Sequence, residues 1–478
     1  MSADEQAVDI VVIGMGPGGE HVAGSLAAKG LRVLGVDHRL VGGECPYWGC
    51  IPSKMMVRAA DALQEARRVP GLAGAIGRIE PDWSTVATRI RDEATDDWDD
   101  QVAVDRFVGQ GGTFVRGTGR IAGPGRVEVA GQMYAAERGI VVNTGTAPSV
   151  PPIPGLDDVP YWTNREAVEA ASLPRSLVVL GGGAIGCELS QAYARFGVEV
   201  TLVEGADRLL PLEEPEAGEI LKAVLEAEGL RVHTGVTAEK AALDREPSGS
   251  GSGSGGDGVV DAGIAGAAGV AVTLRDGRVL RAERLLVATG RRADPGAAGL
   301  DVVGVDPDAR AVPIDDRCRV TDGVWAIGDI TGKGAFTHVS MYQASIVIRD
   351  ILGEEGPAAD YRALPRVTFT DPEVGAVGLT EAQARERLGG VEVGATPLGA
   401  TARGWIHKAG NDGLIKVVAD AERGVLVGAT TMGPAGGEVL GALAVAVHAE
   451  VPIATLRSMM YAYPTLPRGS EDARGALG

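Results

Sequence analysis

The hydrophobic pattern of the chain repeats in two places. Residues 8–37 read VDIVVIGMGPGGEHVAGSLAAKGLRVLGVD, and residues 177–204 read LVVLGGGAIGCELSQAYARFGVEVTLVE. In each copy a short apolar run fits a buried strand, a stretch of small and apolar residues fits a helix, and a second apolar run fits the next strand. The repeat therefore predicts two βαβ units, each built on a parallel sheet.

Glycines stand at matching positions in both copies. They fit the spacing GxGxxG, with Gly14, Gly16 and Gly19 in the first copy and Gly181, Gly183 and Gly186 in the second. The first glycine makes the turn, the second lets the backbone approach a pyrophosphate, and the third lets helix and strand pack. Asp37 and Glu204 each follow the third glycine by 18 positions, where an acid accepts a hydrogen bond from a ribose hydroxyl. We expect two dinucleotide sites.

The rest of the chain carries shorter apolar runs. Strands are expected to end on Thr-Gly in VVNTG (141–145) and LLVATGRRADP (285–295), and on Asp329 in VWAIGD (324–329). From Leu364 onward, runs such as GLIKVVAD and VLVGATTMG precede the apolar pattern EVLGALAVAVHAE, which predicts an α+β domain. The low-complexity segment PSGSGSGSGGDG (247–258) is expected to be a flexible surface loop without chemistry.

Composition and charge narrow the class of protein. A chain of 478 residues is long enough for two to four domains, and its 71 glycines favour a fold with tight turns. The formal net charge is −19 and no basic cluster could follow a phosphate backbone, so nucleic acid is not expected as a partner. The N-terminus lacks the layout of a secretory signal, and no apolar run approaches the roughly 18 residues of a membrane span, so we expect a cytoplasmic protein without a membrane partner.

Two of the four cysteines lie close together. They are Cys45 and Cys50, within GGECPYWGCIPSK (42–54). Structural zinc takes four ligands, and Cys187 and Cys318 stand alone, so no metal site is expected. Four cysteines are also too few for a stabilising disulfide framework in a chain of this length. From the residues alone, the close pair is either a redox-active disulfide or two buried thiols.

The order of these motifs resembles one family. GxGxxG, GGECxxxxCIPSK, a second GxGxxGxE, ATGRR, AIGD and a C-terminal PRVTFTDPEVGAVGLT are similar to the FAD-dependent pyridine nucleotide-disulfide oxidoreductases, which include dihydrolipoamide dehydrogenase. The resemblance implies an α/β fold with two Rossmann-like nucleotide-binding domains, for FAD and NAD, and a C-terminal α+β dimerisation domain. It implies that residues 1–155 and 285–358 bind FAD and that residues 156–284 bind NAD(P). Residues 359–478 would form a homodimer and complete the partner's active site.

The resemblance also implies which residues hold the cofactors. The FAD positions are Gly14, Gly16, Gly18, Gly19, Asp37, Gly43, Lys54, Gly119, Gly145, Asp329 and Thr337. The NAD positions are Gly181, Gly183, Ile185, Gly186, Glu204 and Gly290. Thr337 and His338 would open a helix whose N-terminus faces the flavin, with the imidazole of His338 playing no part.

In the family, electrons pass from NAD(P)H to the flavin, then to the disulfide, and then outward. By resemblance, Cys50 begins a helix and is the flavin-facing sulfur, because a helix N-terminus favours its thiolate. Cys45 would be the sulfur that exchanges with the substrate. The expected partner is a small-molecule disulfide, thiol or quinone-like compound. Lys54 and Glu188 occupy the positions of an ion pair that tunes the flavin.

The choice of nicotinamide cofactor depends mainly on Glu204. A carboxylate at this place accepts from the 2′-hydroxyl of NAD(H) and repels the 2′-phosphate of NADP(H), so NAD(H) is favoured. Arg208 is near enough in the sequence to reach a phosphate if Glu204 turned away, so the use of NADPH stays open.

The C-terminal stretch MMYAYPTLPRGSEDARGALG departs from the family pattern HPTxxE. Tyr463 stands where the family has its catalytic His, and Arg468 stands where it has the orienting Glu. Tyrosine ordinarily has a pKa near about 10 and is a poor general base at neutral pH, so ordinary dihydrolipoamide turnover is not expected. Glu471 could substitute only if the PRGS segment forms a bulge. Tyr47 and Trp48 depart as well, and either line an aromatic or quinone-like acceptor site or pack beside the flavin.

These features favour an FAD-dependent NAD(P)H oxidoreductase that passes electrons through Cys45 and Cys50 to a disulfide or thiol substrate, with altered acid/base residues. Two alternatives remain. One is an NAD(P)H quinone reductase or diaphorase in which the disulfide is a bystander, and the other is a flavin-binding scaffold without turnover. No cysteine follows Cys318, which argues against a C-terminal redox pair.

Overall fold

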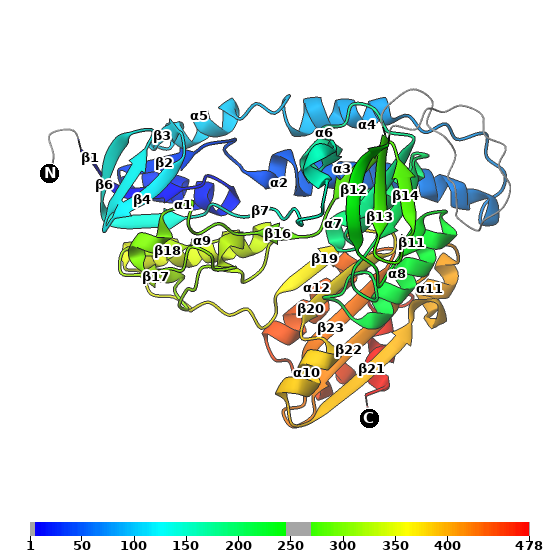
Figure 1. The fold of residues 1–478 in the computed structure, drawn as a ribbon. Coiled ribbons are helices and arrows are strands. Elements are labelled where there is room, and N and C mark those ends of the chain that lie inside the picture. Colours follow the sequence, from blue (N-terminus) through cyan, green and yellow to red (C-terminus); the bar gives the residue numbers. More distant parts are fainter. Residues whose placement is uncertain (1–4, 245–268, 478) are drawn as a thin grey trace. The chain divides into compact units, whose positions relative to one another are not determined.

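The computed structural model describes residues 5–244 and 269–477 and divides the chain into two compact units. The first unit combines Met1–Pro52, Thr88–Ser149 and Arg291–Tyr361, and the second combines Ser53–Ala87, Val150–Gly290 and Arg362–Gly478. Each unit is therefore assembled from segments that are distant in the sequence (Figure 1). The predicted Gly/Ser loop, residues 247–258, lies outside the described residues.

A sheet with parallel central strands forms the core of the first unit. Its order is β17-β18-β6-β1-β2-β3, and β4 and β5 join it through β6. The strands are β1 Gln6–Ile13, β2 Val33–Asp37, β3 Thr113–Arg116, β4 Gly119–Gly123, β5 Arg126–Val129, β6 Gln132–Val142, β17 Arg319–Thr321 and β18 Val324–Ala326, with a separate antiparallel pair of β7 Ala147–Pro148 and β16 Arg291–Arg292. Because β1 pairs in parallel with β2 and β6, the first predicted βαβ unit is confirmed.

Both faces of this sheet are buried. Successive residues of β1 point to opposite faces, and each set packs into a hydrophobic core. Ile10 and Val12 pack in one core with residues of α1 (Pro17–Ala28), α5 (Gln101–Gly109) and α9 (Thr337–Leu352). Val11 and Ile13 pack in the other core. Burial on both sides explains why the strand reads as a continuous apolar run, and each fully buried side chain of this kind contributes roughly 1.5–3 kcal/mol.

The second βαβ unit belongs to the second compact unit. Its parallel sheet has the order β11-β10-β9-β15-β8, and α7 (Ala184–Arg195) connects β9 to β10. The strands are β8 Tyr161–Trp162, β9 Ser176–Leu180, β10 Glu199–Val203, β11 Arg231–His233 and β15 Arg284–Val287. An antiparallel sheet of β12 (Ala238–Asp244), β13 (Gly269–Leu274) and β14 (Val279–Ala282) shares a buried core with them. The neighbouring helices are α3 Cys50–Arg68, α4 Trp83–Arg89, α6 Asn164–Glu169 and α8 Pro215–Ala227.

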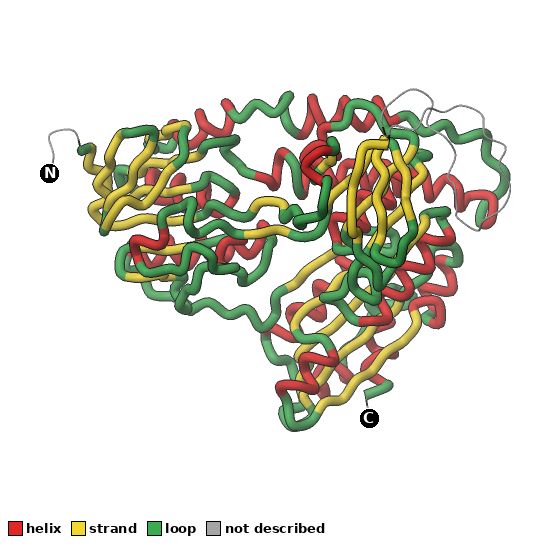
Figure 2. The backbone as a smooth tube through the Cα atoms, in the orientation of Figure 1, coloured by secondary structure: helices red, strands yellow, loops and turns green. Residues whose placement is uncertain are grey.

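The C-terminal part of the second unit is an antiparallel sheet with helices, as the pattern after Leu364 predicts. Its order is β19-β20-β23-β22-β21, with β19 Pro365–Thr368, β20 Glu373–Gly378, β21 Val391–Pro397, β22 Leu414–Asp420 and β23 Val425–Gly433. The helices are α10 Glu381–Arg387, α11 Ala402–His407, α12 Gly436–His448, α13 Ile453–Ser458 and α14 Gly469–Gly475 (Figure 2). α12 packs on β20 and β23, so its apolar residues are core residues. Among the helices of the described residues, none has the length and apolar character needed to cross a membrane.

Lys416 of β22 is a buried cation that joins this C-terminal sheet to the start of α8. Its Nζ lies 2.9 Å from Glu214, 2.8 Å from Glu216 and 2.9 Å from Glu381. Burial acts to lower the pKa of Lys416, but the hydrogen bonds to the three carboxylates outweigh burial and raise that pKa. Lys416 is therefore a fixed positive charge, and without it the buried Glu214 would lose its counter-ion.

We expect Lys416→Met to lower the free energy of unfolding by about 3–5 kcal/mol, because removing one partner of a buried ion pair leaves the other uncompensated. Urea denaturation followed by circular dichroism measures the change. Lys240→Met is the matched control, since Lys240 lies on β12 with an exposed side chain, and it should change stability little. Equal stabilities of the two variants would contradict the role assigned to Lys416.

Candidate active site

The first glycine turn links β1 to α1 in the first unit. Gly14 has a φ of +94°, and a Cβ there would lie 2.4 Å from the carbonyl oxygen of Asn143. A Cβ on Gly19 would lie 2.0 Å from the carbonyl oxygen of Gly14, and one on Gly18 would lie 2.1 Å from Oγ of Ser340 in α9. These positions therefore require glycine for packing. Gly16 stands at the N-cap of α1 without a side chain, which leaves the helix N-terminus open to an anion.

The second glycine turn has the same construction in the second unit. Gly181 has a φ of +108°, and a Cβ on Gly186 would lie 1.8 Å from the carbonyl oxygen of Gly181. Gly183 is the N-cap of α7, and Ile185, in the first turn of this helix, is 37% exposed. Gly290 follows β15 with a φ of +112°. Both turns thus present a helix N-terminus at the end of a parallel strand, the arrangement that receives a pyrophosphate.

Asp37 and Glu204 play equivalent parts in the two turns. Oδ2 of Asp37 accepts a hydrogen bond from the Met15 N–H at 2.8 Å, and Oδ1 accepts from the Arg39 N–H at 2.8 Å. Oε2 of Glu204 accepts from the Gly182 N–H at 2.5 Å, and Oε1 accepts from the Ala206 N–H at 2.7 Å. Each carboxylate therefore ties the end of its strand to the middle of the glycine turn, in the position that a ribose would approach.

The loop that carries the cysteines lies directly against the first glycine turn. The Gly42 N–H donates to the carbonyl oxygen of Met15 at 2.7 Å. Gly43 has a φ of +67°, and a Cβ there would lie 2.9 Å from Cα of Gly16. The contact is therefore made by main chain on both sides. It places the short helix α2 (Glu44–Tyr47), which contains Cys45, beside the turn that receives the pyrophosphate.

Cys50 is the first residue of α3, as the sequence predicted. Its side chain is exposed, whereas Cys45 is half-buried. Gly49 brings the chain back toward α2, because a Cβ on Gly49 would lie 3.4 Å from Cα of Cys45. Sγ of Cys50 lies 3.5 Å from Oγ1 of Thr337, the first residue of α9. The structure thus brings together the start of α9 and the cysteine that opens α3.

The other two cysteines are buried. Cys187 lies in α7 and Cys318 precedes β17, and both are 0% exposed. Burial raises the pKa of the Cys187 thiol, and burial raises that of Cys318 to about 12. Both therefore stay protonated at neutral pH and are poor nucleophiles.

Asp329 is held beside the end of β6. Thr146 donates from Oγ1 to Oδ2 of Asp329 at 3.1 Å, and Arg291 donates from Nε to Oγ1 of Thr146 at 2.9 Å. Burial raises the pKa of Asp329, and the hydrogen bond from Thr146 opposes that rise. Gly145 precedes this group with a φ of +66°. A Cβ on Gly119 would lie 3.2 Å from side-chain carbons of Ile13 in β1 and of Val36 in β2.

Lys54 and Glu188 form an ion pair within the second unit. Nζ of Lys54 lies 2.7 Å from Oε2 of Glu188, which is 5% exposed. The other carboxylate oxygen, Oε1, accepts from the Phe369 N–H at 2.8 Å, and Nζ of Lys54 lies 4.7 Å from the centre of the Phe369 ring. One residue therefore contacts both partners, with its backbone on the carboxylate and its ring on the ammonium group.

Sequence reasoning missed Phe369 and the neighbours that hold its loop. Gln191 exchanges two hydrogen bonds with the backbone of Asp371, each 2.8 Å long, and Arg195 pairs with the carboxylate of Asp371 at 2.7 Å. Glu188, Gln191 and Arg195 are spaced three and four residues apart, so they share one face of α7. This polar stripe, inside a helix that otherwise reads as small and apolar, is the signal that could have located the contact.

Tyr463, Arg468 and Glu471 gather on the C-terminal segment. The guanidinium carbon of Arg468 lies 5.5 Å from the centre of the Tyr463 ring, and Nη1 lies 2.8 Å from Oε2 of Glu471. Tyr463 is 70% exposed. Arg468 is the N-cap of α14, so the PRGS segment enters a helix and does not form a bulge. Glu471 is accordingly paired with Arg468 of the same segment.

Of the two aromatic residues between the cysteines, Tyr47 is buried and Trp48 is half-buried. Tyr47 is 6% exposed, and its ring lies 5.9 Å from that of Trp48.

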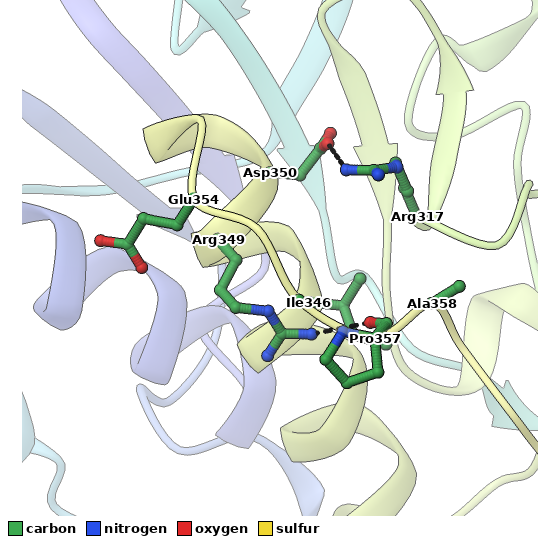
Figure 3. A pocket seen from close by; sticks show the side chains of 8 residues that line it. Arg317, Ile346, Arg349, Asp350, Glu354, Pro357 and Ala358 are labelled. Atoms are coloured by element: carbon green, nitrogen blue, oxygen red, sulfur yellow. Dashed lines mark hydrogen bonds and ion pairs between the residues drawn. The ribbon is translucent and has the colours of Figure 1, made fainter.

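Figure 3 shows a pocket at the end of α9. It is lined by Arg317, Ile346, Arg349, Asp350, Glu354, Gly356, Pro357 and Ala358. Its volume is about 10 Å³, which suits one water molecule and excludes a dinucleotide.

Comparisons with known proteins agree with this arrangement. A family model described as pyridine nucleotide-disulphide oxidoreductase matches residues 8–344, and a model of that family's dimerisation domain matches residues 364–474. The dihydrolipoyl dehydrogenase of Thermus scotoductus is 32% identical, over 98% of this chain and 97% of the relative. The mercuric reductase of Streptomyces lividans is 32% identical, over 96% of this chain and 94% of the relative.

Solved structures give the same result. LpdA of Mycobacterium tuberculosis has a TM-score of 0.81 to this chain at 25% identity, and the match covers 98% of this chain and 99% of LpdA. The HOCl-induced flavoprotein disulfide reductase RclA of Escherichia coli has a TM-score of 0.80 at 25% identity, covering 99% of each chain.

We expect Gly43→Ala to lower the amount of FAD retained on purification several-fold, because its Cβ would press on Gly16 and displace the glycine turn. The ratio of flavin to protein absorbance measures the loss. Gly30→Ala is the control, since Gly30 also has a positive φ, +87°, but its Cβ would meet no atom of the described residues within 4 Å. Full flavin content in Gly43→Ala would contradict the close contact.

Proposed function

Because the chain belongs to the pyridine nucleotide-disulphide oxidoreductase family, whose members use FAD and NAD(P)H, we propose that Cys45 and Cys50 form its redox-active disulfide. The observation that carries the proposal is the main-chain contact between the cysteine loop and the first glycine turn. The second support is the position of Cys50 at the start of α3 and beside Thr337. The substrate is proposed to be a small disulfide or thiol compound.

The residues of the first unit fit FAD. The turn at Gly14 and Gly16 offers a helix N-terminus to a pyrophosphate, and Asp37 offers a carboxylate to a ribose. Asp329 follows β18 of the same sheet and is held by Thr146. Bound FAD would supply two-electron transfer between the nicotinamide and sulfur. The protein's own contribution is to bind it, orient it and hold the sulfur atoms.

The cysteines would divide the work at sulfur. The N-terminus of α3, a helix of 19 residues, favours negative charge on Sγ of Cys50. Once electrons from NAD(P)H have reduced the Cys45–Cys50 disulfide to two thiols, the Cys45 thiolate attacks one sulfur of the substrate disulfide. This attack forms a mixed disulfide and releases the first thiol. The Cys50 thiolate then attacks Sγ of Cys45, which restores the Cys45–Cys50 disulfide and releases the second thiol. The two electrons come from the nicotinamide, and the released thiolates take up two protons.

Lys54 is proposed to act as a fixed positive charge in this path. It lies four residues after Cys50 in α3, so the two side chains share one face of the helix. Glu188 and the Phe369 ring hold its ammonium group in one place. A fixed cation near developing negative charge stabilises the reduced state without moving a substrate proton.

The outward side of the site is proposed to recognise an unusual acceptor. Arg468 and the exposed Tyr463 offer a cation and an aromatic ring where the family pattern has a His-Glu pair. The relatives named mercuric reductase point to a second acceptor class, a soft metal ion that two thiolates can bind. A quinone is a third acceptor class, and its reduction would not need the cysteines. We propose a homodimer formed through the dimerisation domain, residues 364–474.

NAD(H) is proposed to be the preferred nicotinamide cofactor. Glu204 is held at the second glycine turn by two backbone donors, so its carboxylate stays where a 2′-hydroxyl would donate to it. Arg208 donates to the carbonyl oxygens of Pro211 and Glu213, at 2.9 and 3.4 Å, so it is engaged by its own loop.

We expect Cys45→Ser and Cys50→Ser each to reduce NADH-dependent disulfide reduction at least 100-fold while FAD stays bound. In the wild-type enzyme, two-electron reduction should expose two new thiols per subunit, and alkylation with mass spectrometry counts them. The same panel includes mercuric ion and a quinone. Undiminished turnover of every accepted disulfide and of mercuric ion in both variants would refute the redox disulfide, and quinone reduction that survives in both would support the quinone reductase.

We expect kcat/KM to be at least tenfold higher with NADH than with NADPH. Glu204→Gln should reduce this preference several-fold, because its amide oxygen can still accept a hydrogen bond while the charge that repels a 2′-phosphate is lost. Steady-state kinetics with each nicotinamide at fixed acceptor concentration gives the ratio. Equal use of both cofactors by the wild-type enzyme would contradict the assignment.

A further inference from the structure

A strained segment, residues 95–100, lies beside the cysteine loop in the first unit. It follows a π-helical turn, Ile90–Ala94, and precedes α5. Asp96, Asp97 and Trp98 have φ values of 49°, 55° and 57°, so three consecutive residues with side chains are in the left-handed region. That conformation costs roughly 1–2 kcal/mol per residue, so contacts elsewhere must hold the segment in place.

The contacts fall on the cysteine loop, on both sides of Cys45. Nε1 of Trp98 donates to the carbonyl oxygen of Tyr47 at 3.3 Å, and Oη of Tyr47 donates to the carbonyl oxygen of Asp99 at 3.5 Å. Oδ2 of Asp100 accepts from the Val41 N–H at 2.6 Å. Val41 precedes the two glycines that touch the first glycine turn, and Tyr47 stands between the cysteines. The segment therefore binds the loop at two points, Val41 and Tyr47.

The contacts at both points are hydrogen bonds to buried residues, Asp100 at one point and Tyr47 at the other. Asp100 is 7% exposed and also accepts from Nη2 of Arg116, at 2.8 and 2.7 Å, so its charge is balanced. Burial, reinforced by the negative charge of Asp100, raises the pKa of Tyr47 to about 12. Tyr47 therefore keeps its proton at neutral pH and remains a donor.

The hydrogen bond from Trp98 supplies a partner for a carbonyl group at the C-terminus of the short helix α2. Tyr47 is the last residue of α2, which is one turn long, and the carbonyl groups at a helix C-terminus lack partners within the helix. The indole N–H satisfies one of them. Because Cys45 lies in the same single turn, fixing the carbonyl of Tyr47 fixes the backbone from which Cys45 projects.

We propose that Trp98 is a positioning residue that holds Cys45 within reach of Cys50. The inference rests on the proposed redox role of these two cysteines. A thiol held close to its partner has a high effective concentration toward it, which favours the disulfide over the two free thiols. Loosening α2 lowers that concentration and makes the disulfide easier to reduce.

The test is a redox titration of the FAD-bound enzyme in dithiothreitol buffers, with alkylation and mass spectrometry to count Cys45 and Cys50 thiols. Trp98→Phe keeps an aromatic ring and removes only the N–H donor. We expect the equilibrium constant for disulfide formation to fall 3- to 10-fold, which corresponds to a potential about 15–30 mV less negative. Trp98→His, which keeps a ring N–H, should restore a value near that of the wild type.

Asp97→Asn is the matched control. Asp97 is exposed and adjacent to Trp98, and asparagine tolerates the left-handed conformation, so the strained turn is kept. Its titration should match the wild type, and a shift as large as that of Trp98→Phe would overturn the proposal, because the indole contact would then not be the cause. Flavin content and thermal midpoint establish that each variant is folded.

The outcomes separate this inference from the proposed function. A wild-type enzyme in which Cys45 and Cys50 never form a disulfide would refute the redox role itself, whatever Trp98 does. A wild-type enzyme that titrates normally, with Trp98→Phe indistinguishable from it, would refute the positioning role alone. Should Trp98→Phe not fold, Trp98→Leu removes the same N–H donor, and an unchanged potential in that variant would overturn the proposal.

Discussion

The candidate site of the first unit depends on one close approach of two backbones. Gly43 lies against Gly16, and a single Cβ on Gly43 would come within 2.9 Å of Cα of Gly16. Because the contact contains no side chain, the backbone of the cysteine loop packs directly against the backbone of the glycine turn. This contact helps to position the N-terminus of α1, Cys45 and the N-terminus of α3. An anion bound at the glycine turn would therefore lie close to the loop that carries the cysteine sulfur.

The second unit is organised by buried charges instead. Glu188, Arg195 and Lys416 each lie below 6% exposure, and each has two or more polar partners. Removing water from a charge costs several kcal/mol unless its partners are well placed, so such groups tolerate few alternative arrangements. Glu188 and Arg195 stand on one face of α7, the helix that begins at the second glycine turn. The same helix thus presents its N-terminus to a dinucleotide and its polar stripe to the loop at Phe369.

Much of this arrangement could be predicted because it is local. The GxGxxG spacing, the acid 18 positions later, the start of α3 at Cys50 and the start of α9 at Thr337 depend on turns and helix ends that neighbouring residues determine. The contacts of Phe369 and Trp98 join residues 181 and 51 positions apart, so no local pattern names these two partners, although the polar stripe of α7 indicates that α7 has one. Tyr47 was open to two interpretations, and only its burial shows that it packs inside the loop.

The sequence by itself determined the family, the two βαβ units and the chemistry available at Cys45 and Cys50, since residue type and short spacing encode these properties. Only the tertiary structure decided what surrounds that chemistry. It placed Gly43 against Gly16, Phe369 against both members of an ion pair, Arg468 over Tyr463, and a left-handed turn against α2. The physical reason is that a buried hydrogen bond or a main-chain contact depends on the packing of distant segments, which no local pattern of residues records.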